Sequence, residues 1–256
     1  MLPAKRQAII LEYLRDEQFA AWQDLARVAN ASLSTVRRDV ELLCDRGHLR
    51  RTRGGAALRQ NERLAVETGP EIAPELARDQ KQRIARHTVA EIEPRQALLL
   101  DSGSTTLAIA HALLERRIAL TVFTNDLMIA ATLARSADIE VHVPPGQVRC
   151  GSSTLLGSAC YRTMTGLRVD IAWIGAHAVC RDGASETSTE HGEIKRVMLH
   201  AADQRILVVD SGKFGGRSRA LFAPLTDFDR IVTDDQLSNE TRDDLCQHGA
   251  TIETAV

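Results

Sequence analysis

Two groups of residues in this sequence have types and spacings that suit the binding of anions. The first combines hydroxyl residues and arginines at helical spacing with further arginines in a short alternating segment that follows. Its members are Ser34, Thr35, Arg37, Arg38, Arg50, Arg51, Arg53 and Gly54. An arginine fork pairs with guanine O6 and N7 or with a phosphate, so this group predicts contacts with double-stranded DNA. A solvated basic face without a partner is the alternative that charge alone leaves open.

The second group consists of polar turns that each follow an apolar segment. Small hydroxyl residues and glycine at a strand-to-helix turn expose backbone N–H groups at the positive end of a helix, which favours phosphate. A carboxylate there accepts from a sugar hydroxyl, and a lysine neutralises a phosphate. Ordinary capped loops and a surface lysine are the alternative, but three such turns favour one shared site. The members are Asp101, Ser102, Gly103, Ser104, Thr105, Thr106, Asn125, Asp126, Asp210 and Lys213.

Helical elements must position the first group. The apolar spacing predicts three helices, at residues 5–15, 22–29 and 33–45, and Ser32 is the expected N-cap of the third. Val36, Val40 and Leu43 should face inward and leave the arginines outside. A short basic strand over residues 49–56, ending in a Gly-Gly turn, completes the outline of a winged helix-turn-helix.

Alternating strands and helices must position the second group. Short apolar strands separated by amphipathic helices predict an α/β domain with a mostly parallel sheet covered on both faces. We therefore divide the chain into a DNA-binding domain at 1–58, a linker at 59–74 and a larger domain at 75–256. The predicted strands are 97–100, 120–124, 139–143, 171–174, 206–209 and 231–233, and the predicted helices are 75–91, 105–114, 127–135, 190–201 and 238–247.

Composition is consistent with this division. Residues 1–60 hold 11 Lys+Arg against 7 Asp+Glu, whereas the whole 256-residue chain has a net charge of −2, so a basic end joins an acidic body. The five cysteines are scattered without ligand or disulfide spacing, and neither a metal nor a cofactor is expected. The chain has no apolar run of about 20 residues and no signal-peptide pattern, which predicts a cytoplasmic protein without membrane contact.

The N-terminal motif resembles the DNA-binding signature of the DeoR family of bacterial sugar-metabolism repressors. The resemblance rests on the runs Ser34 to Val40, Gly47 to Arg51 and Gly54 to Ala56. Val40 replaces the family's usual leucine, and Arg53 takes a place often held by histidine. Neither change removes a hydrogen-bond donor.

The polar turns resemble the effector domain of the same family, which is related in fold to ribose-5-phosphate isomerase. The resemblance adds Lys195, in the run Glu193 to Met198, although the spacing from Glu193 to this lysine is shorter than the family pattern. Pro144-Pro145-Gly146 also departs from the usual Gly-Gly. The resemblance implies a repressor that a phosphorylated sugar or polyol releases from operator DNA, and that acts as a homodimer or homotetramer.

Two other functions are alternatives to repression. The isomerases carry an acid-rich D-G-A-D-E run, but the comparable segment Ile174 to Ala178 lacks every carboxylate. Proton abstraction beside a carbonyl needs a positioned base, and His177 is the one candidate there, so we expect a protein that is not an enzyme. A DNA-binding factor that responds to no metabolite is the second alternative, and the polar turns argue against it.

Overall fold

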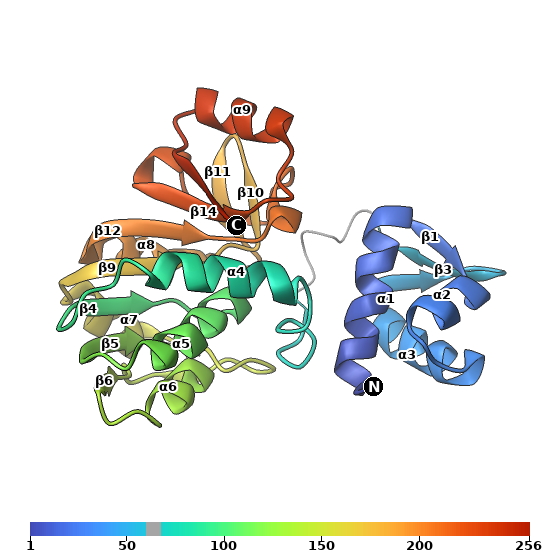
Figure 1. Ribbon diagram of the computed structural model, residues 1–256, viewed down its shortest axis with the longest axis horizontal. Coiled ribbons are helices and arrows are strands. Elements are labelled where there is room, and N and C mark those ends of the chain that lie inside the picture. The colour runs from blue at the N-terminus through green and yellow to red at the C-terminus, as the bar shows by residue number, and fades with distance from the viewer. Residues whose placement is uncertain (60–67) are drawn as a thin grey trace. The chain divides into compact units, whose positions relative to one another are not determined.

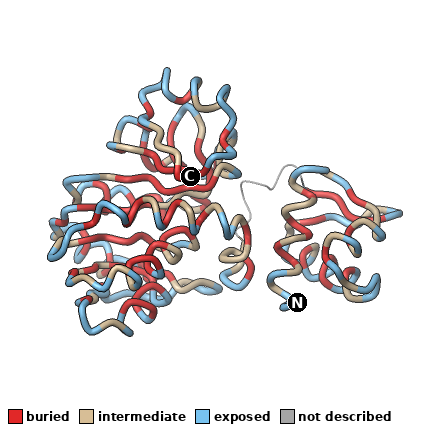
Figure 2. The backbone as a smooth tube through the Cα atoms, viewed as in Figure 1, coloured by how far each residue is buried: buried red, intermediate tan, exposed pale blue. Residues whose placement is uncertain are grey.

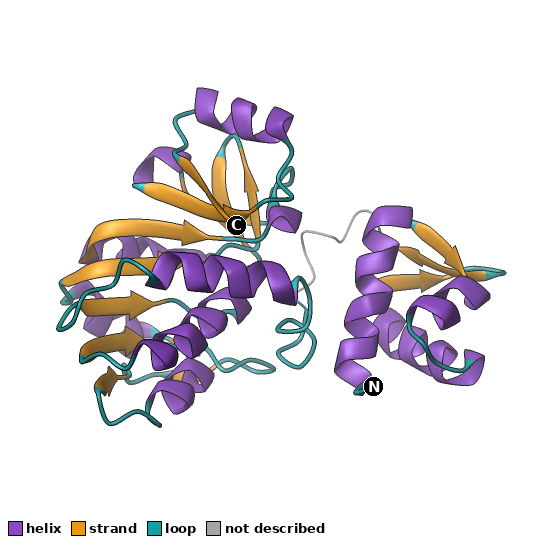
Figure 3. Cartoon of the chain, in the orientation of Figure 1, coloured by secondary structure: helices purple, strands orange, loops and turns teal. Residues whose placement is uncertain are grey.

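The computed structural model describes residues 1–59 and 68–256, which form two compact units, Met1–Arg78 and Asp79–Val256. Figure 1 shows the order of the elements, and Figure 3 separates the helices from the strands. No helix among the described residues is long and apolar enough to cross a membrane.

The N-terminal unit packs three helices against a small antiparallel sheet. The side chains of Ile10, Leu25, Val40 and Leu49 are fully or almost fully buried between them. Ser32 caps the third helix by accepting from the Thr35 N–H, as predicted. The first strand was not predicted, because three residues are too few to show a pattern. The elements are α1 Pro3–Glu17, β1 Phe19–Ala21, α2 Trp22–Val28, α3 Leu33–Asp45, β2 Leu49–Arg51 and β3 Gly55–Leu58, with sheet order β1-β3-β2.

The boundary between the units lies later in the chain than the sequence predicts. Ile72 and Leu76 are buried in the core of the N-terminal unit, and the Ala77 N–H donates to Glu12 Oε1 at 2.6 Å. The apolar side chains at the end of the predicted linker 59–74 therefore belong to the first unit, and the first helix of the second unit begins at Arg78 rather than Glu75. Residues 60–67 of that linker lie outside the described part.

The second unit is built on a seven-stranded sheet in which every neighbouring pair runs parallel. Its strand order is β15-β14-β12-β9-β4-β5-β6. The predicted α/β fold class is confirmed. The strands are β4 Ala97–Leu100, β5 Leu120–Thr124, β6 Ile139–His142, β9 Val169–Ile174, β12 Ala202–Val208, β14 Arg230–Asp234 and β15 Ile252–Ala255, and the helices are α4 Arg78–Val89, α5 Ser104–Arg116, α6 Leu127–Leu133, α7 Ser158–Thr165, α8 Thr189–Ala201 and α9 Asn239–Gln247.

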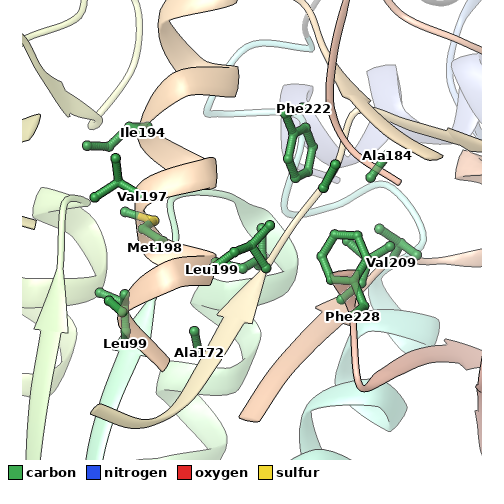
Figure 4. Close-up of a cluster of buried hydrophobic side chains, with 14 of the residues drawn as sticks. Leu99, Ala172, Ala184, Ile194, Val197, Met198, Leu199, Val209, Phe222 and Phe228 are labelled. Carbon is green, nitrogen blue, oxygen red and sulfur yellow. The ribbon is translucent and has the colours of Figure 1, made fainter. Parts of the chain in front are cut away.

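The sheet is buried on both faces, as Figure 2 shows by its burial colouring. Successive residues of a strand point to opposite faces, so Leu98 and Leu100 pack with α4, α5 and α6, whereas Leu99 packs with α7 and α8. Figure 4 shows Met198 and Leu199 of α8 in the cluster that contains Leu99. This two-sided burial explains why the central strands β4 and β9 have largely apolar sequences.

Two smaller sheets were not predicted. The strands β10 Ala178–Cys180, β11 Gly183–Glu186 and β13 Ala220–Ala223 form an antiparallel sheet, and β7 Gln147–Val148 pairs with β8 Leu155–Leu156. Their short and partly polar sequences show no clear period. At Gly183, φ is +130° and an added Cβ would lie 2.1 Å from the Ala223 carbonyl oxygen, so only glycine fits this crossing.

Candidate functional sites

Helix α3 separates an apolar face from a polar one. Val36, Val40 and Leu43 are buried, whereas Ser34, Arg37 and Arg38 are exposed. Thr35 is half-buried, and its hydroxyl lies 2.8 Å from the capping Ser32 Oγ. The predicted division of the helix is therefore present, with the arginines on the exposed side near its N-terminal end.

Asp39 anchors this helix, although the sequence places it beside the two arginines. It is buried, its Oδ1 accepts from Arg6 Nη2 at 3.1 Å and from Gln7 Nε2 at 3.2 Å, and its Oδ2 accepts from Arg6 Nε. Charge-assisted bonds of this kind are stronger than neutral ones, so they fix α3 against α1. Sequence reasoning missed this role because the partners lie 32 and 33 residues away.

Four of the predicted arginines make no ion pair within the described residues. Arg37, Arg38, Arg50 and Arg53 are exposed. Arg51 differs, because its Nη1 lies 3.6 Å from Glu41 Oε1. Guanidinium groups without a carboxylate partner, on one helix and on the adjoining strand and turn, are suited to a polyanion.

The wing is the hairpin formed by β2, β3 and the turn between them. Its two adjacent glycines, Gly54 and Gly55, have different roles. An added Cβ on Gly55 would lie 1.8 Å from the Ala20 carbonyl oxygen, because β1 and β3 pair closely there. An added Cβ on Gly54 would meet no atom within 4 Å. The predicted Gly-Gly turn is corrected accordingly: Gly55 begins β3, and the turn lies at residues 52–54.

The second predicted group lies at the carboxyl edge of the large sheet. The chain runs outward from β4 through β5 to β6, and then crosses over so that β9 pairs with the other side of β4. Loops that follow the two central strands diverge at such a reversal, and ligands of open α/β sheets bind there. Asp101 directly follows β4 and Gly175 directly follows β9.

Lys195 forms the centre of this edge. Its ammonium lies 2.6 Å from Asp101 Oδ2 and 2.8 Å from Glu186 Oε1, and it donates to the Gly175 carbonyl at 2.8 Å. All three charged side chains are buried. The Gly175 N–H also donates to Asp101 Oδ2, at 3.0 Å. The site therefore joins the loops after β4 and β9 through one ion triad.

The charges of this triad influence one another. Burial raises the pKa of Asp101, and the Lys195 ammonium opposes that rise without cancelling it. Burial acts in the same direction on Glu186, but there the Lys195 ammonium, together with His191 and His177, outweighs it and the pKa lies below its usual range. Burial would lower the pKa of Lys195, yet its two carboxylate neighbours hold that pKa above its usual value.

Two buried acceptor atoms near the triad have no hydrogen-bond partner among the described residues. They are Asp101 Oδ1 and Asn125 Oδ1. Leu100 of β4 pairs with Thr124 of β5 in register. Asp101 and Asn125 therefore directly follow neighbouring strands, which lie about 5 Å apart. Asn125 is held by a bond from its Nδ2 to the Leu155 carbonyl, at 3.2 Å. Buried acceptors are normally satisfied, so this pair is suited to hydroxyl groups of a ligand.

The turn between β4 and α5 leaves backbone donors at the helix start. Gly103 has a φ of +145°, and the Thr106 hydroxyl donates to the Gly103 carbonyl at 3.0 Å. The Thr105 and Thr106 side chains are buried, whereas Ser102 and Ser104 are half-buried and Gly103 is exposed. The first N–H groups of a helix have no partner inside it and favour an anion.

The remaining predicted residues follow strands β5 and β12. Asp126 caps α6, because its Oδ1 accepts from the Met128 and Ile129 N–H groups and from the Ser153 hydroxyl. This carboxylate is therefore already used inside the protein. Asp210 is buried at the end of β12, and the half-buried Lys213 closes the short turn that follows it. Asp234, which was not predicted, accepts from the Ser211 N–H at 2.7 Å and holds that turn.

The carboxylate that accompanies Lys195 is a further residue that the sequence did not identify. Glu193, which the motif places near Lys195, is exposed on α8. Glu186 pairs with the lysine instead, from the end of β11. The segment Ile174 to Ala178 lacks carboxylates, but Asp101 accepts from the Gly175 N–H and Glu186 contacts Lys195 beside it, so two carboxylates come from other segments. Across the described residues, no three His, Cys, Asp or Glu side chains are placed to hold a metal ion.

Comparison with known families matches both units. A model of the DeoR C terminal sensor domain matches residues 76–235, and a model of the DeoR-like helix-turn-helix domain matches residues 6–62.

Several curated proteins are similar along most of the chain. An uncharacterized HTH-type transcriptional regulator of Escherichia coli, YgbI, is 32% identical, over 93% of this chain and 92% of its own. The glycerol-3-phosphate regulon repressor of Escherichia coli is 28% identical, over 91% and 92%. The HTH-type transcriptional repressor GlcR of Bacillus subtilis is 28% identical, over 96% and 93%.

Among solved structures, ribose 5-phosphate isomerase A of Methanocaldococcus jannaschii is similar over 54% of this chain and 55% of its own. The TM-score is 0.37 and the sequence identity 16%. The translation initiation factor eIF-2B of Pyrococcus horikoshii is similar over 88% and 81%, with a TM-score of 0.43 and 13% identity.

Proposed function

The chain belongs to the DeoR family of transcription regulators, and on that premise we propose that it represses carbohydrate-metabolism genes in the cytoplasm. A phosphorylated sugar or polyol would release it from operator DNA. The observation that carries the DNA-binding half is the exposed set of unpaired arginines on α3 and the wing. A recognition helix presents such donors from its N-terminal turns to base edges and phosphates.

The sensing half of the proposal rests on complementary groups at one sheet edge. The unpartnered acceptors Asp101 Oδ1 and Asn125 Oδ1 suit hydroxyl groups of a sugar or polyol. The first N–H groups of α5, with the hydroxyls of Ser102 and Ser104, suit a phosphate. Lys213, in the turn after β12, would supply a positive charge to the same ligand. Relatives named as the glycerol-3-phosphate regulon repressor and a putative aga operon repressor support a ligand of this class.

The ligand would act through linkage between the two units. It changes DNA affinity only if it binds more tightly to an arrangement that cannot place two recognition helices on DNA. Two matched half-sites require at least a dimer, so we propose a homodimer or homotetramer. Sedimentation velocity that gives a monomer, both with and without DNA, would contradict this part.

Catalysis is the second candidate, because Asp101 and Glu186 bring two carboxylates to the position beside Gly175. A general base works best with a pKa near the working pH, but Lys195 lowers that of Glu186. Lys195 and the Gly175 N–H also hold one oxygen of Asp101. We therefore propose a binding protein rather than an enzyme. Isomer formation above background from ribose 5-phosphate and the purified protein would overturn this.

Fluorescence anisotropy of labelled DNA from upstream of this protein's own gene tests the function directly. We expect tight binding at moderate salt that one member of a panel of sugar and polyol phosphates weakens. Binding that no compound disturbs would favour an effector-independent factor. Absence of specific binding, repeated in a selection from random DNA sites, would refute repression.

Two substitutions separate the halves of this function. Arg38→Ala should weaken DNA binding and leave effector binding unchanged, because the arginine is exposed on α3. Lys213→Ala should leave DNA binding unchanged and raise the effector concentration needed for release. Both proteins are compared by anisotropy and by calorimetric titration of the effector. Equal damage to both activities by both substitutions would indicate unfolding instead.

A further inference from the structure

Trp22 connects the recognition helix to the wing. It is the first residue of α2, and the Arg37 guanidinium of α3 lies over its ring, 5.6 Å from the ring centroid. Its backbone N–H donates to the Gly54 carbonyl at 3.1 Å, in the wing turn. The indole is half-buried and packs against the core of the N-terminal unit.

Arg37 and Arg38 occupy different positions around α3. With about 100° of rotation per residue, Arg38 and Ser34 each lie about 160° from the buried Val36, at the centre of the exposed face. Arg37 lies only about 100° from Val36, at the side of that face. Its contact with Trp22 draws it toward α2 and away from the stripe that contains Arg38.

We propose that Trp22 is a positioning residue that holds Arg37 for contact with a DNA phosphate, while Arg38 contacts the bases. This assignment rests on the proposed DNA-binding function. A guanidinium held over the face of an indole keeps N–H groups available, and it loses less freedom when a phosphate binds. A group at the side of a recognition helix reaches the backbone that borders the groove more readily than the groove floor.

The two arginines should therefore differ in what their loss changes. Arg37→Ala should weaken binding to operator and to scrambled DNA by the same factor. It should also reduce the slope of log K against log salt by about 0.9, the value for one phosphate. Arg38→Ala should instead reduce the ratio of operator to scrambled affinity. A loss of that ratio in Arg37→Ala would contradict the assignment.

A double-mutant cycle tests the role of Trp22. Trp22→Leu keeps an apolar side chain but removes the ring, and we expect it to weaken binding to both DNAs by about 2- to 5-fold. In the Arg37→Ala background, Trp22→Leu should have no further effect on DNA affinity. In the wild-type background, Trp22→Phe keeps an aromatic ring and should retain most of the affinity that Trp22→Leu loses. A purely structural role would give the same loss in both backgrounds, which would overturn the proposal.

Quenching by acrylamide gives a test that needs no substitution. Trp173 is fully buried, so the quenching reports chiefly on Trp22. DNA that contacts the Arg37–Trp22 pair should reduce this quenching on binding, and unchanged quenching in a saturated complex would overturn the proposal. Wild-type protein that binds no DNA would refute the repressor function itself. If the wild type binds DNA normally but the effects of Trp22→Leu and Arg37→Ala on DNA affinity are additive, only the role of Trp22 is refuted.

Discussion

At the residue scale, Lys195 decides whether two buried carboxylates can remain charged. Its ammonium contacts both Asp101 and Glu186. Removing one partner from a buried ion pair leaves an uncompensated charge, which costs about 3–5 kcal/mol. Lys195→Met should therefore lower the free energy of unfolding of the second unit by about that amount at pH 8.

The pH dependence of this loss identifies its cause. Without the ammonium, both carboxylates take pKa values above those of the unfolded chain, so the folded variant binds more protons and its stability falls as pH rises. The loss should therefore be smaller at pH 5 than at pH 8. Urea unfolding, followed by Trp173 fluorescence in the Trp22→Phe background, measures it. Glu193→Gln on the same helix is the control, expected within about 0.5 kcal/mol of the parent. An equal loss at both pH values would contradict the charge argument.

The residues of the site differ in how far the sequence could reveal them. Asp101 and Asn125 follow clear apolar strands, so the rule that carboxyl ends of parallel strands meet was enough to group them. Lys195 was found only through a motif. Glu186 was missed because it comes from a short strand of another sheet, and Asp39 because its partners lie on α1. Side chains that depend on distant pairings have no local pattern to identify them.

At the element scale, the wing depends on the close pairing of β1 and β3. An added methyl on Gly55 would overlap the Ala20 backbone, which cannot move without separating the two strands. Gly55→Ala should destabilise the N-terminal unit by about 1–3 kcal/mol and weaken DNA binding. Hydrogen exchange of Phe19 to Ala21 should become faster.

Gly54→Ala is the matched control, because the added methyl meets open space. We expect its stability to stay within about 0.5 kcal/mol of the parent. Faster exchange at β1 in the Gly54 variant, or none in the Gly55 variant, would show that the close pairing is not what the wing requires.

The large elements were predictable because their patterns are local. β4 and β5 begin and end at the predicted residues, since each is a short, mostly apolar run bounded by polar turns. The antiparallel sheet of β10, β11 and β13 was not predicted. β13 pairs with a strand some 35 residues earlier, and that earlier strand consists of one glycine, one alanine, one serine and one glutamate. Such strands are defined by their partners more than by their own sequence.

At the scale of the whole molecule, the proposed DNA face and the proposed ligand site lie in different units. Any communication between them is a coupling free energy, and a typical value changes affinity by about 5–150-fold. The coupling must be reciprocal: if the effector weakens operator binding by a given factor, the operator must weaken effector binding by the same factor. Calorimetric titration of the effector, with and without saturating operator, measures one factor, and anisotropy measures the other.

A variant that lacks one of the protein groups proposed to bind the effector provides the control for this reciprocity. Asn125→Leu removes one of the two unpartnered acceptors and the bond to Leu155, so the effector should bind weakly while the free protein still binds operator. In that variant the effector should leave operator affinity almost unchanged, and the operator should leave effector affinity almost unchanged. Both factors should therefore approach 1 over the range of effector concentrations that releases the wild-type protein. In the wild type, an operator affinity that keeps falling as effector concentration rises, without reaching a plateau, would contradict an equilibrium between two arrangements of the units. Release would then result from direct competition of the ligand for the DNA-binding face.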